Sequence, residues 1–172
     1  ILQLKKGMYM TRTFYEQHRA DYPFSAAVSA ILIPQSYLSL EFILQQHNLL
    51  TEVTYPITCI TTKNTRRIVN PIGTFWYRNI RDNLYRDFAI TEYFGIRIAQ
   101  ASIAKALFDY LYLRPLPASY RRPKINLAGE LRLNLDELST MDRDDFSRIV
   151  EESTSRKMTD ILNNFRSNVW HP

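Results

Sequence analysis

The chain has 172 residues, of which 45% are hydrophobic and 13% aromatic, so it can bury the core of one domain. This composition excludes a disordered chain, and no apolar run reaches the ~18 residues that a membrane-spanning helix needs. Residues 1–124 hold 16 Lys and Arg against 8 Asp and Glu, whereas residues 125–172 hold 6 against 9. The sequence thus predicts a basic body that could meet an anion such as nucleic acid, and the alternative is that the charges only maintain solubility.

Cysteine usage and the first residues indicate the compartment. Cys59 is the only cysteine, so no internal disulfide can form and the chain fits a reducing, cytoplasmic environment. Residues 1–10 contain two lysines and no apolar segment of the signal-peptide kind. Because the chain starts at Ile1 rather than at methionine, we expect a fragment or a chain whose first residues are not seen.

The first predicted elements are a hairpin and a helix. Residues 2–10 alternate in character around Lys5-Lys6-Gly7, which predicts a β-hairpin with Gly7 in its turn. Residues 22–33 carry apolar side chains at helical spacing, and Pro34 ends this helix.

A second helix is predicted over residues 39–48. The Ser39 hydroxyl can cap its first turn, and Asn48 is a plausible C-terminal stop. His47 ends the apolar stripe of this helix, so we predict a packed or capping histidine there rather than a ligand.

The middle of the chain is rich in β-branched and aromatic residues, which are typical of strands. Strands are predicted at residues 53–62, 74–80 and 88–99, the last broken at Gly95. Pro56 belongs at the start of the first strand or on an edge, because proline cannot donate to a sheet. Residues 63–67 form a polar, basic loop.

The remaining elements are helical. Ser102 begins the clearest helix, whose apolar residues follow the i, i+3, i+4, i+7 pattern up to Leu113. After a connector over residues 115–128, short helices are predicted at 135–138, 142–152 and 156–165. Consecutive strands with helices at both ends predict an α+β fold, in which a small mixed sheet is covered by helices and a helical C-terminal tail follows.

The sequence offers little chemistry for catalysis. His18, His47 and His171 lack metal-ligand spacing, the four glycines are isolated, and no Gly-x-Ser-x-Gly motif is present. Cys59 lies in a predicted strand and is interpreted as a structural thiol. We therefore predict a protein that is not an enzyme and that needs no metal and no cofactor.

A metal-dependent nuclease is the enzymatic alternative. It would use Glu52 and Lys63, which flank the strand over 53–62, together with Lys105 and Asp109. Lys105 and Asp109 are one helical turn apart and are predicted to face away from the apolar stripe, so a solvated ion pair is the simpler interpretation.

Two groups of basic residues are candidate nucleic-acid contacts. The hairpin group resembles the phosphate-binding wing of a winged helix-turn-helix, although an ordinary edge hairpin is the alternative. It consists of Lys5, Lys6, Tyr9 and Arg12. The strand group is a phosphate-binding or partner-binding face, or a merely solvated basic face. It consists of Lys63, Arg66, Arg67, Arg78, Arg81 and Arg86.

Two segments together resemble a known family. Tyr37-Leu38-Ser39 leads into an amphipathic helix that ends near His47, and Ile98-Ala99 precedes a helix that contains Lys105-Ala106-Leu107-Phe108-Asp109. Lys6-Gly7-Met8-Tyr9 is similar to the Lys/Arg-Gly-x-Tyr strand of the family's wing. Over residues 5–113 the chain resembles bacterial regulators of the AbiEi antitoxin type.

The resemblance implies a domain organisation and a function. AbiEi-type antitoxins have a winged helix-turn-helix followed by an α/β antitoxin domain, repress their own operon and neutralise a nucleotidyltransferase-like toxin. By this resemblance, residues 1–13 are the wing hairpin of an otherwise absent winged helix. Residues 14–124 are the antitoxin-like domain, and residues 125–172 are its helical extension. The implied partners are operator DNA and the cognate toxin; a homodimer stays open, and no membrane is involved.

A different function remains open as an alternative. The chain could be a DNA-binding transcriptional regulator that senses a ligand or partner and has no toxin. A pocket lined by Trp76, Tyr77, Tyr93 and Phe94 would favour this alternative.

Overall fold

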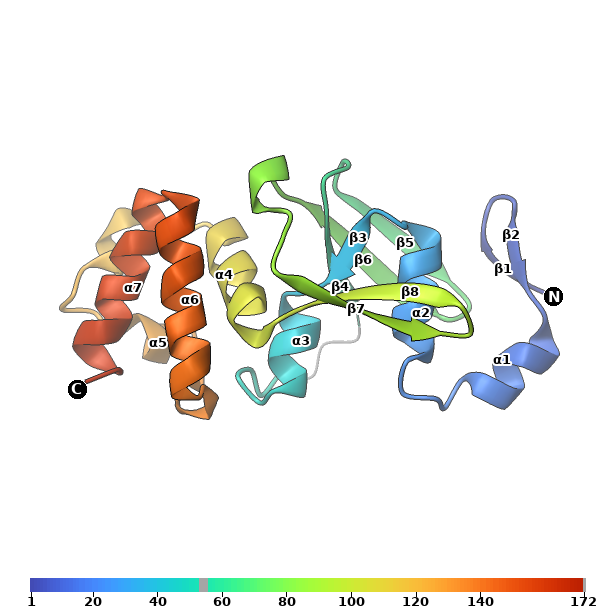
Figure 1. Cartoon of the computed structure of the whole chain (residues 1–172), viewed down its shortest axis with the longest axis horizontal. Helices are drawn as coiled ribbons and strands as arrows, with labels where there is room; N and C mark the ends of the chain where they lie inside the picture. The colour runs from blue at the N-terminus through green and yellow to red at the C-terminus, as the bar shows by residue number, and fades with distance from the viewer. Residues whose placement is uncertain (53–55, 172) are drawn as a thin grey trace. The chain divides into compact units, whose positions relative to one another are not determined.

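The computed structural model describes residues 1–52 and 56–171, and it confirms the predicted α+β class. The chain divides into two compact units (Figure 1). Unit 1 comprises residues 1–42 and 54–101, and unit 2 comprises residues 43–53 and 102–172. This grouping differs from the expected ranges: the hairpin belongs with the sheet, and the helix after Ser102 belongs with the C-terminal helices.

Unit 1 holds the sheets. Its elements are β1 (Leu2–Lys5), β2 (Met8–Met10), α1 (Arg12–His18), α2 (Phe24–Leu32), β3 (Ser36–Leu38), β4 (Ile57–Thr61), β5 (Arg66–Asn70), β6 (Gly73–Asn79), the 3₁₀ turn η1 (Asp82–Leu84), β7 (Phe88–Tyr93) and β8 (Ile96–Ala101). Strands β3 to β8 form one mixed sheet in the order β5-β6-β4-β3-β8-β7. The predicted strand over residues 53–62 is present as β4, although residues 53–55 lie outside the described part of the chain.

The N-terminal hairpin is docked on the rest of unit 1. Gly7 has a φ of +79°, which glycine adopts without strain, and it forms the predicted turn between β1 and β2. Leu4 is buried, and its carbonyl accepts a hydrogen bond of 3.1 Å from the Asn70 side chain in β5. The Lys5 ammonium donates to the Leu32 carbonyl at 2.6 Å, at the C-terminal end of α2. These contacts fix the hairpin against the large sheet.

Four elements of unit 1 were not predicted, namely α1, the three-residue strand β3, β5 and η1. Helix α1 buries none of its residues, so it has no apolar stripe that a sequence pattern could reveal. Strand β5 begins inside the predicted loop over residues 63–67, because exposed arginines at its start hide its strand character. The predicted helix over 22–33 is α2, and the strand pair broken at Gly95 is β7 and β8.

One face of the sheet is covered by α2, which packs against β8, β3 and β4. The Tyr77 hydroxyl in β6 donates to the Ser29 carbonyl of α2 at 2.7 Å, and this links the helix to the sheet. Cys59 in β4 is fully buried, as predicted for a structural thiol. Burial raises the pKa of this thiol to about 12, and a hydrogen bond with Ser29 offsets only part of the effect.

Helix α3 (Glu41–Gln46) begins one residue later than Ser39 would cap it, because Leu40, with a φ of +61°, directly precedes the helix. The Thr58 hydroxyl of β4 accepts from the Phe42 backbone N–H at 3.0 Å and donates to the Ser39 carbonyl at 2.6 Å. A strand residue therefore caps this helix. Asn48 ends it with a φ of +60°, as predicted. Of the two alternatives predicted for His47, the packed one is wrong because the side chain is exposed, and the capping one stays a prediction.

Unit 2 is helical. Its elements are α4 (Ile103–Leu113), the 3₁₀ turn η2 (Ala118–Arg121), α5 (Leu127–Glu130), the 3₁₀ turn η3 (Leu135–Glu137), α6 (Thr140–Ser153) and α7 (Arg156–Asn168). Helix α4 starts next to Ser102, where the start was predicted, and the structure shows Ser102 as its cap: the hydroxyl accepts from the backbone N–H of Lys105. The predicted helices at 135–138, 142–152 and 156–165 correspond to η3, α6 and α7. Phe146, Phe165 and Trp170 form an aromatic cluster in the core of this unit.

The prediction that Lys105 and Asp109 face solvent is wrong. Their side chains are 1% and 0% exposed, and the ammonium nitrogen lies 2.9 Å from the Asp109 Oδ1. Residues 104–111 of α4 are all buried, so this helix has no solvent-facing side in the middle of its length. A buried ion pair differs physically from the predicted surface pair, because each charge would be costly to bury without the other.

Candidate nucleic-acid interface

The exposed basic surface of unit 1 is built by the edge strand β5 and its neighbour β6. The two strands are antiparallel, and Arg67 lies directly opposite Trp76. Trp76 and Arg78 are two residues apart in β6, so they project from the same face of the sheet. The Arg78 guanidinium carbon lies 5.4 Å from the centre of the Trp76 indole ring, in a cation–π contact. We call Arg67, Trp76 and Arg78 the Trp76 surface.

Alternation in β6 explains why an indole is exposed here. Phe75 and Tyr77 are fully buried, whereas Trp76 between them is 40% exposed. The period-two pattern of a strand forces neighbouring side chains to opposite faces. Trp76 was considered from the sequence only as a pocket-lining residue and not as part of the basic face, although this alternation is visible in the sequence Gly73–Asn79.

The structure separates the other members of the predicted strand group. Arg66 lies opposite Tyr77, so it projects from the other face of the strand pair. Lys63 is exposed in the β4–β5 turn. Arg81 precedes η1, and Arg86 forms an ion pair of 3.3 Å with Asp87. The structure therefore does not gather the six predicted residues into one face.

Hydrogen bonds hold the β4–β5 turn beside the Trp76 surface. The Asn79 side-chain amide donates to the carbonyls of Thr62 and Lys63 at 3.0 and 2.9 Å. The Asn79 backbone N–H donates to the Thr65 hydroxyl at 3.0 Å. The position of Lys63 is thereby tied to the end of β6.

The hairpin group is partly engaged within the molecule. Lys6, Tyr9 and Arg12 are exposed and free to meet a ligand. Lys5, in contrast, donates to the Leu32 carbonyl, which gives it a role in docking the hairpin. The electropositive part of the hairpin is thus the turn and the segment that follows β2.

A second cluster of polar and aromatic side chains lies between α1 and the β7–β8 turn, and it was not predicted. Asp21 Oδ2 accepts a hydrogen bond of 2.5 Å from the Tyr93 hydroxyl, and His18 Nδ1 lies 2.8 Å from the same oxygen. The hydrogen bond from Tyr93 is the main cause that lowers the pKa of Asp21, and the bond with His18 adds to it. Burial first, and then the hydrogen bond with Asp21, raise the pKa of Tyr93 to about 12.

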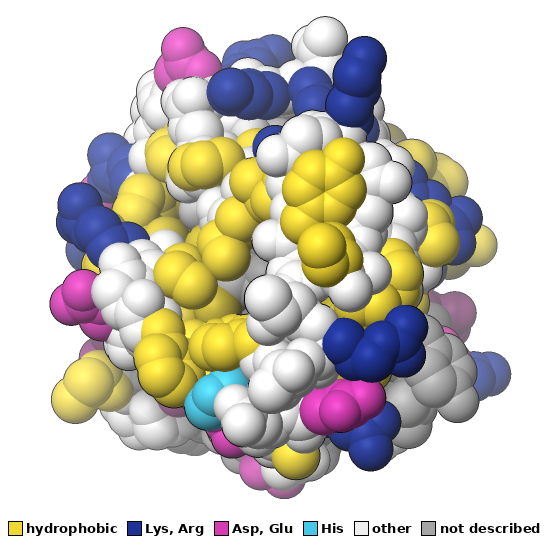
Figure 2. Space-filling view, turned by 90° about the vertical axis from the view of Figure 1, so that its right-hand side faces the viewer, with side chains coloured by type: hydrophobic (Ala, Val, Ile, Leu, Met, Phe, Trp, Pro, Cys, Tyr) yellow, Lys and Arg dark blue, Asp and Glu magenta, His cyan; other side chains and the backbone are white. Residues whose placement is uncertain are grey.

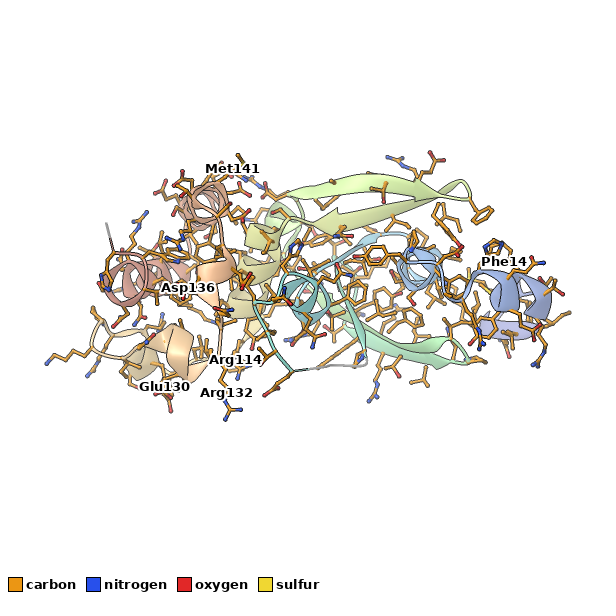
Figure 3. All side chains as sticks on the ribbon, turned by 90° about the horizontal axis from the view of Figure 1, so that it is seen from below. Phe14, Arg114, Glu130, Arg132, Asp136 and Met141 are labelled. Carbon is orange, nitrogen blue, oxygen red and sulfur yellow. The ribbon has the colours of Figure 1, made fainter. Side chains whose placement is uncertain are left out.

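Aromatic rings surround this cluster. Phe14 on α1 stands edge-to-face with Phe94, with ring centres 5.5 Å apart (Figure 3). Phe94 has a φ of +48° and is 63% exposed, which is an uncommon conformation for a bulky residue. Figure 2 shows this end of unit 1, where hydrophobic side chains gather around a hollow and basic side chains follow its upper edge. Only the i,i+3 spacing of His18 and Asp21 hinted at this cluster in the sequence.

Unit 1 also contains a cavity of about 480 Å³. Its lining comes from α2, the start of β3, Tyr85, β7 and β8: Ala30, Ile31, Pro34, Ser36, Tyr85, Phe88, Ile90, Ile96, Arg97 and Ala99. The aromatic pocket considered from the sequence does not form. Trp76 and Tyr77 belong to β6, which β4, β3 and β8 separate from Tyr93 in β7, and Trp76 and Tyr77 face opposite sides.

Three of the four residues of the nuclease alternative are engaged in other contacts, and the fourth, Lys63, is exposed in the β4–β5 turn. Lys105 and Asp109 are buried against each other, and Glu52 pairs with Arg132 at 3.6 Å on the surface of unit 2. Among residues 1–52 and 56–171, no group of three or more His, Cys, Asp and Glu side chains is placed to hold a metal ion.

Comparison of the chain with protein-family models, curated protein sequences and solved structures finds no match. In the described part of the chain, no helix is both long and apolar enough to span a bilayer.

Proposed function

We propose that the chain is an antitoxin-like transcriptional regulator that acts by binding, represses its own operon and neutralises a nucleotidyltransferase-like toxin. The observation that carries this proposal is the burial of four of the residues on which the family resemblance rests, whereas His47 of the same motifs is exposed. Tyr37, Ser39, Lys105 and Asp109 are each at most 1% exposed. Buried polar residues are rare because they require partners, so a shared set of them favours a shared fold.

The hairpin supports the regulatory part of the proposal. Lys6-Gly7-Met8-Tyr9 forms the turn and second strand of a docked hairpin, as the resemblance to a wing implies. Lys6, Tyr9 and Arg12 remain exposed and could contact DNA phosphates. In this proposal the hairpin steadies an operator complex, and the rest of the chain engages the toxin stoichiometrically without catalysis.

The first test is a pull-down between the full-length protein and the product of the adjacent gene, followed by growth rescue on co-expression. The proposal expects a stable complex and restored growth. The matched control is a variant with Glu16→Gln on the exposed side of α1, which should bind and rescue like the wild type. No complex in a sensitive binding assay, together with unrelieved toxicity, would reject the antitoxin proposal.

The 480 Å³ cavity of unit 1 favours a second candidate, a regulator that senses a ligand and has no toxin. Its lining is mainly apolar with one arginine, Arg97, so a small amphipathic anion would fit it. An Ile90→Trp variant should fill the cavity and abolish any ligand-induced rise in the melting temperature. Retained operator binding without toxin binding, plus such a ligand effect, would favour this candidate.

A further inference from the structure

We propose that the Trp76 surface binds single-stranded nucleic acid, with a base stacked on the Trp76 indole and phosphates held by Arg67 and Arg78. This inference concerns a surface separate from the hairpin, and it does not depend on the antitoxin proposal. Its basis is one exposed indole in β6, which contacts the Arg78 guanidinium and lies opposite Arg67 of the edge strand β5.

An exposed tryptophan needs a physical reason, because burying its ring would stabilise the fold. Trp76 is 40% exposed, whereas its neighbours Phe75 and Tyr77 are fully buried. Aromatic side chains on a strand serve as stacking platforms for unpaired bases in single-strand binding proteins, since every base has a π face. The Arg78 guanidinium lies over the Trp76 ring, with its carbon 5.4 Å from the ring centre, so it covers one face of the indole. A base would therefore stack on the other face, beside a phosphate-binding group.

The charge around this ring selects an anionic partner. No Asp or Glu occurs between residues 56 and 81, whereas this segment contains five basic residues. They are Lys63, Arg66, Arg67, Arg78 and Arg81. Of these, Arg67 and Arg78 share the face of the Trp76 ring, whereas Arg66 projects from the opposite face. An excess of positive charge attracts a polyanion, and arginine binds phosphate through its planar fork of donors.

The backbone beneath this surface is well constrained. Strand β6 pairs with β5 on one side and with β4 on the other over five residue pairs each. The β4–β5 turn that carries Lys63 is tied to Asn79 by hydrogen bonds. Because this part of the protein is already ordered, little conformational entropy is lost when a nucleic-acid strand binds, and this favours affinity.

The same geometry argues against duplex DNA and against an acidic protein as the occupant. In a duplex the base faces are stacked inside and cannot reach the Trp76 ring. An acidic protein segment would satisfy the arginines but would leave the indole without a planar partner. An unpaired polynucleotide offers both groups, phosphate and accessible base, in regular alternation.

The test measures binding of the full chain to fluorescein-labelled 20-nucleotide dT and rU strands and to a duplex of equal length. We expect single strands to bind more tightly than the duplex. A Trp76→Ala variant should weaken single-strand binding by about tenfold, because base–aromatic stacking is worth about 1–3 kcal/mol per base. Trp76→Tyr should retain most of the affinity, since tyrosine also stacks.

Salt dependence tests the arginines separately. Arg67→Gln and Arg78→Gln should each reduce the log–log salt slope by about 0.7, the value for one phosphate of a single strand. The matched aromatic control is Tyr120→Ala in unit 2, where the exposed fraction of 42% is close to that of Trp76. This control should bind like the wild type, and the folding of each variant is checked by its thermal midpoint.

Three outcomes would overturn the inference. If Trp76→Ala binds like the wild type while the arginine variants weaken single strand and duplex equally, the surface is only an electrostatic one. If poly-glutamate displaces the dT strand as well as excess unlabelled dT does, the surface fits an acidic partner rather than nucleic acid. Absence of single-strand binding at low salt would also reject it.

Discussion

Asp21 joins two segments that are distant in sequence, since its carboxylate accepts from Tyr93 and contacts His18. At the scale of residues, this contact depends on one carboxylate oxygen, one phenol hydroxyl and one ring nitrogen. The lowered pKa of Asp21 means that the folded state favours its ionised form. The raised pKa of Tyr93 means that the folded state favours its neutral form. The contact therefore stabilises the folded state only at pH values where Asp21 is ionised and Tyr93 is neutral.

This contact predicts a specific pH dependence. The Tyr93 contribution is fully present below its usual pKa of 10 and is lost as the pH rises towards about 12. The Asp21 contribution is present above its usual pKa of 3.8 and is lost as the pH falls through its lowered value. The measurement is the urea midpoint of wild type and Tyr93→Phe between pH 3 and pH 12. The difference between the two proteins should shrink at both ends of this range.

The control for this experiment is Tyr22→Phe, which removes an exposed hydroxyl. Its urea midpoint should follow that of the wild type at every pH. A Tyr93→Phe difference that stays constant from pH 3 to pH 12 would show that the hydroxyl does not act through Asp21.

The buried pair of Lys105 and Asp109 gives the second prediction at this scale. Asp109→Leu or Lys105→Met alone should lower the free energy of unfolding by about 3–5 kcal/mol, because the remaining charge is left buried. The double variant should cost less than the sum of the two single changes. Urea denaturation measures all three variants.

The matched control is the exposed pair Arg148 and Glu152 on α6, with the same i,i+4 spacing and an N–O distance of 2.9 Å. Arg148→Met should cost about 1 kcal/mol or less, as expected for a surface ion pair. Equal losses for the buried and exposed pairs would contradict the role given to burial. The sequence shows both pairs identically, and only packing distinguishes them.

At the scale of elements, two asparagines of α7 organise the connector before α5. Asn168 donates to the Pro123 carbonyl at 2.9 Å, and Asn164 makes three further hydrogen bonds. The buried Asn164 amide donates to the carbonyls of Arg122 and Ile125 at 2.8 and 2.7 Å. Its oxygen accepts from the Leu127 backbone N–H at 3.2 Å. A proline-containing segment without long helices thus obtains partners for its backbone groups from a neighbouring helix.

Removal of the Asn164 side chain should loosen the connector. Asn164→Ala is expected to lower the free energy of unfolding by about 2–3 kcal/mol, because it leaves buried backbone groups without partners. It should also speed tryptic cleavage after Arg121 or Lys124, whereas Pro123 blocks cleavage after Arg122. Asn163→Ala, at the adjacent exposed position, should change stability by no more than about 0.5 kcal/mol. Similar cleavage rates for the two variants would contradict this assignment.

Elements with strong local signals were predictable. The hairpin around Gly7, the helix after Ser102 and the break at Gly95 each depend on a residue whose conformational or capping preference acts locally. Helix α1 and strand β5 were missed, because exposed elements lack the regularly spaced apolar residues from which a helix or a strand is recognised. The cap of α3 could not be predicted either, since Thr58 reaches it from another element.

At the scale of the whole chain, the charge is unevenly divided between the two units. Unit 1 holds 11 Lys and Arg against 6 Asp and Glu, and unit 2 holds 11 against 11. The net charge of +5 therefore belongs to unit 1, where both candidate nucleic-acid surfaces lie. The sequence indicated a basic body and an acidic end, but its boundary at residue 124 did not coincide with the division near Ser102.

This division predicts which charges govern binding to duplex operator DNA. A Lys6→Gln/Arg12→Gln variant should reduce the log–log salt slope by about 1.8, because each phosphate contact contributes about 0.9. A Lys124→Gln/Arg156→Gln variant in unit 2 loses the same net charge and should keep the wild-type slope. Equal reductions in the two variants would mean that overall charge, rather than the hairpin, governs the interaction.

The candidate site was only partly predictable for a similar reason. Basic residues can be counted in a sequence, but their grouping depends on strand register and on the two faces of a sheet. Register unites Arg67 with Trp76 and places Arg66 on the opposite face. The contact between Asp21 and Tyr93 spans 72 positions, so no local pattern could reveal it.

The burial of Cys59 has a practical consequence for experiments with this protein. The chain has one thiol, and it is fully buried in β4 with a pKa raised to about 12. A maleimide dye should therefore leave the folded protein unmodified and should react only when the sheet opens. The rate at which the dye modifies Cys59 in the wild-type chain thus measures how often the sheet opens. A cysteine introduced at an exposed position such as Met141 could carry a spectroscopic label without replacement of Cys59.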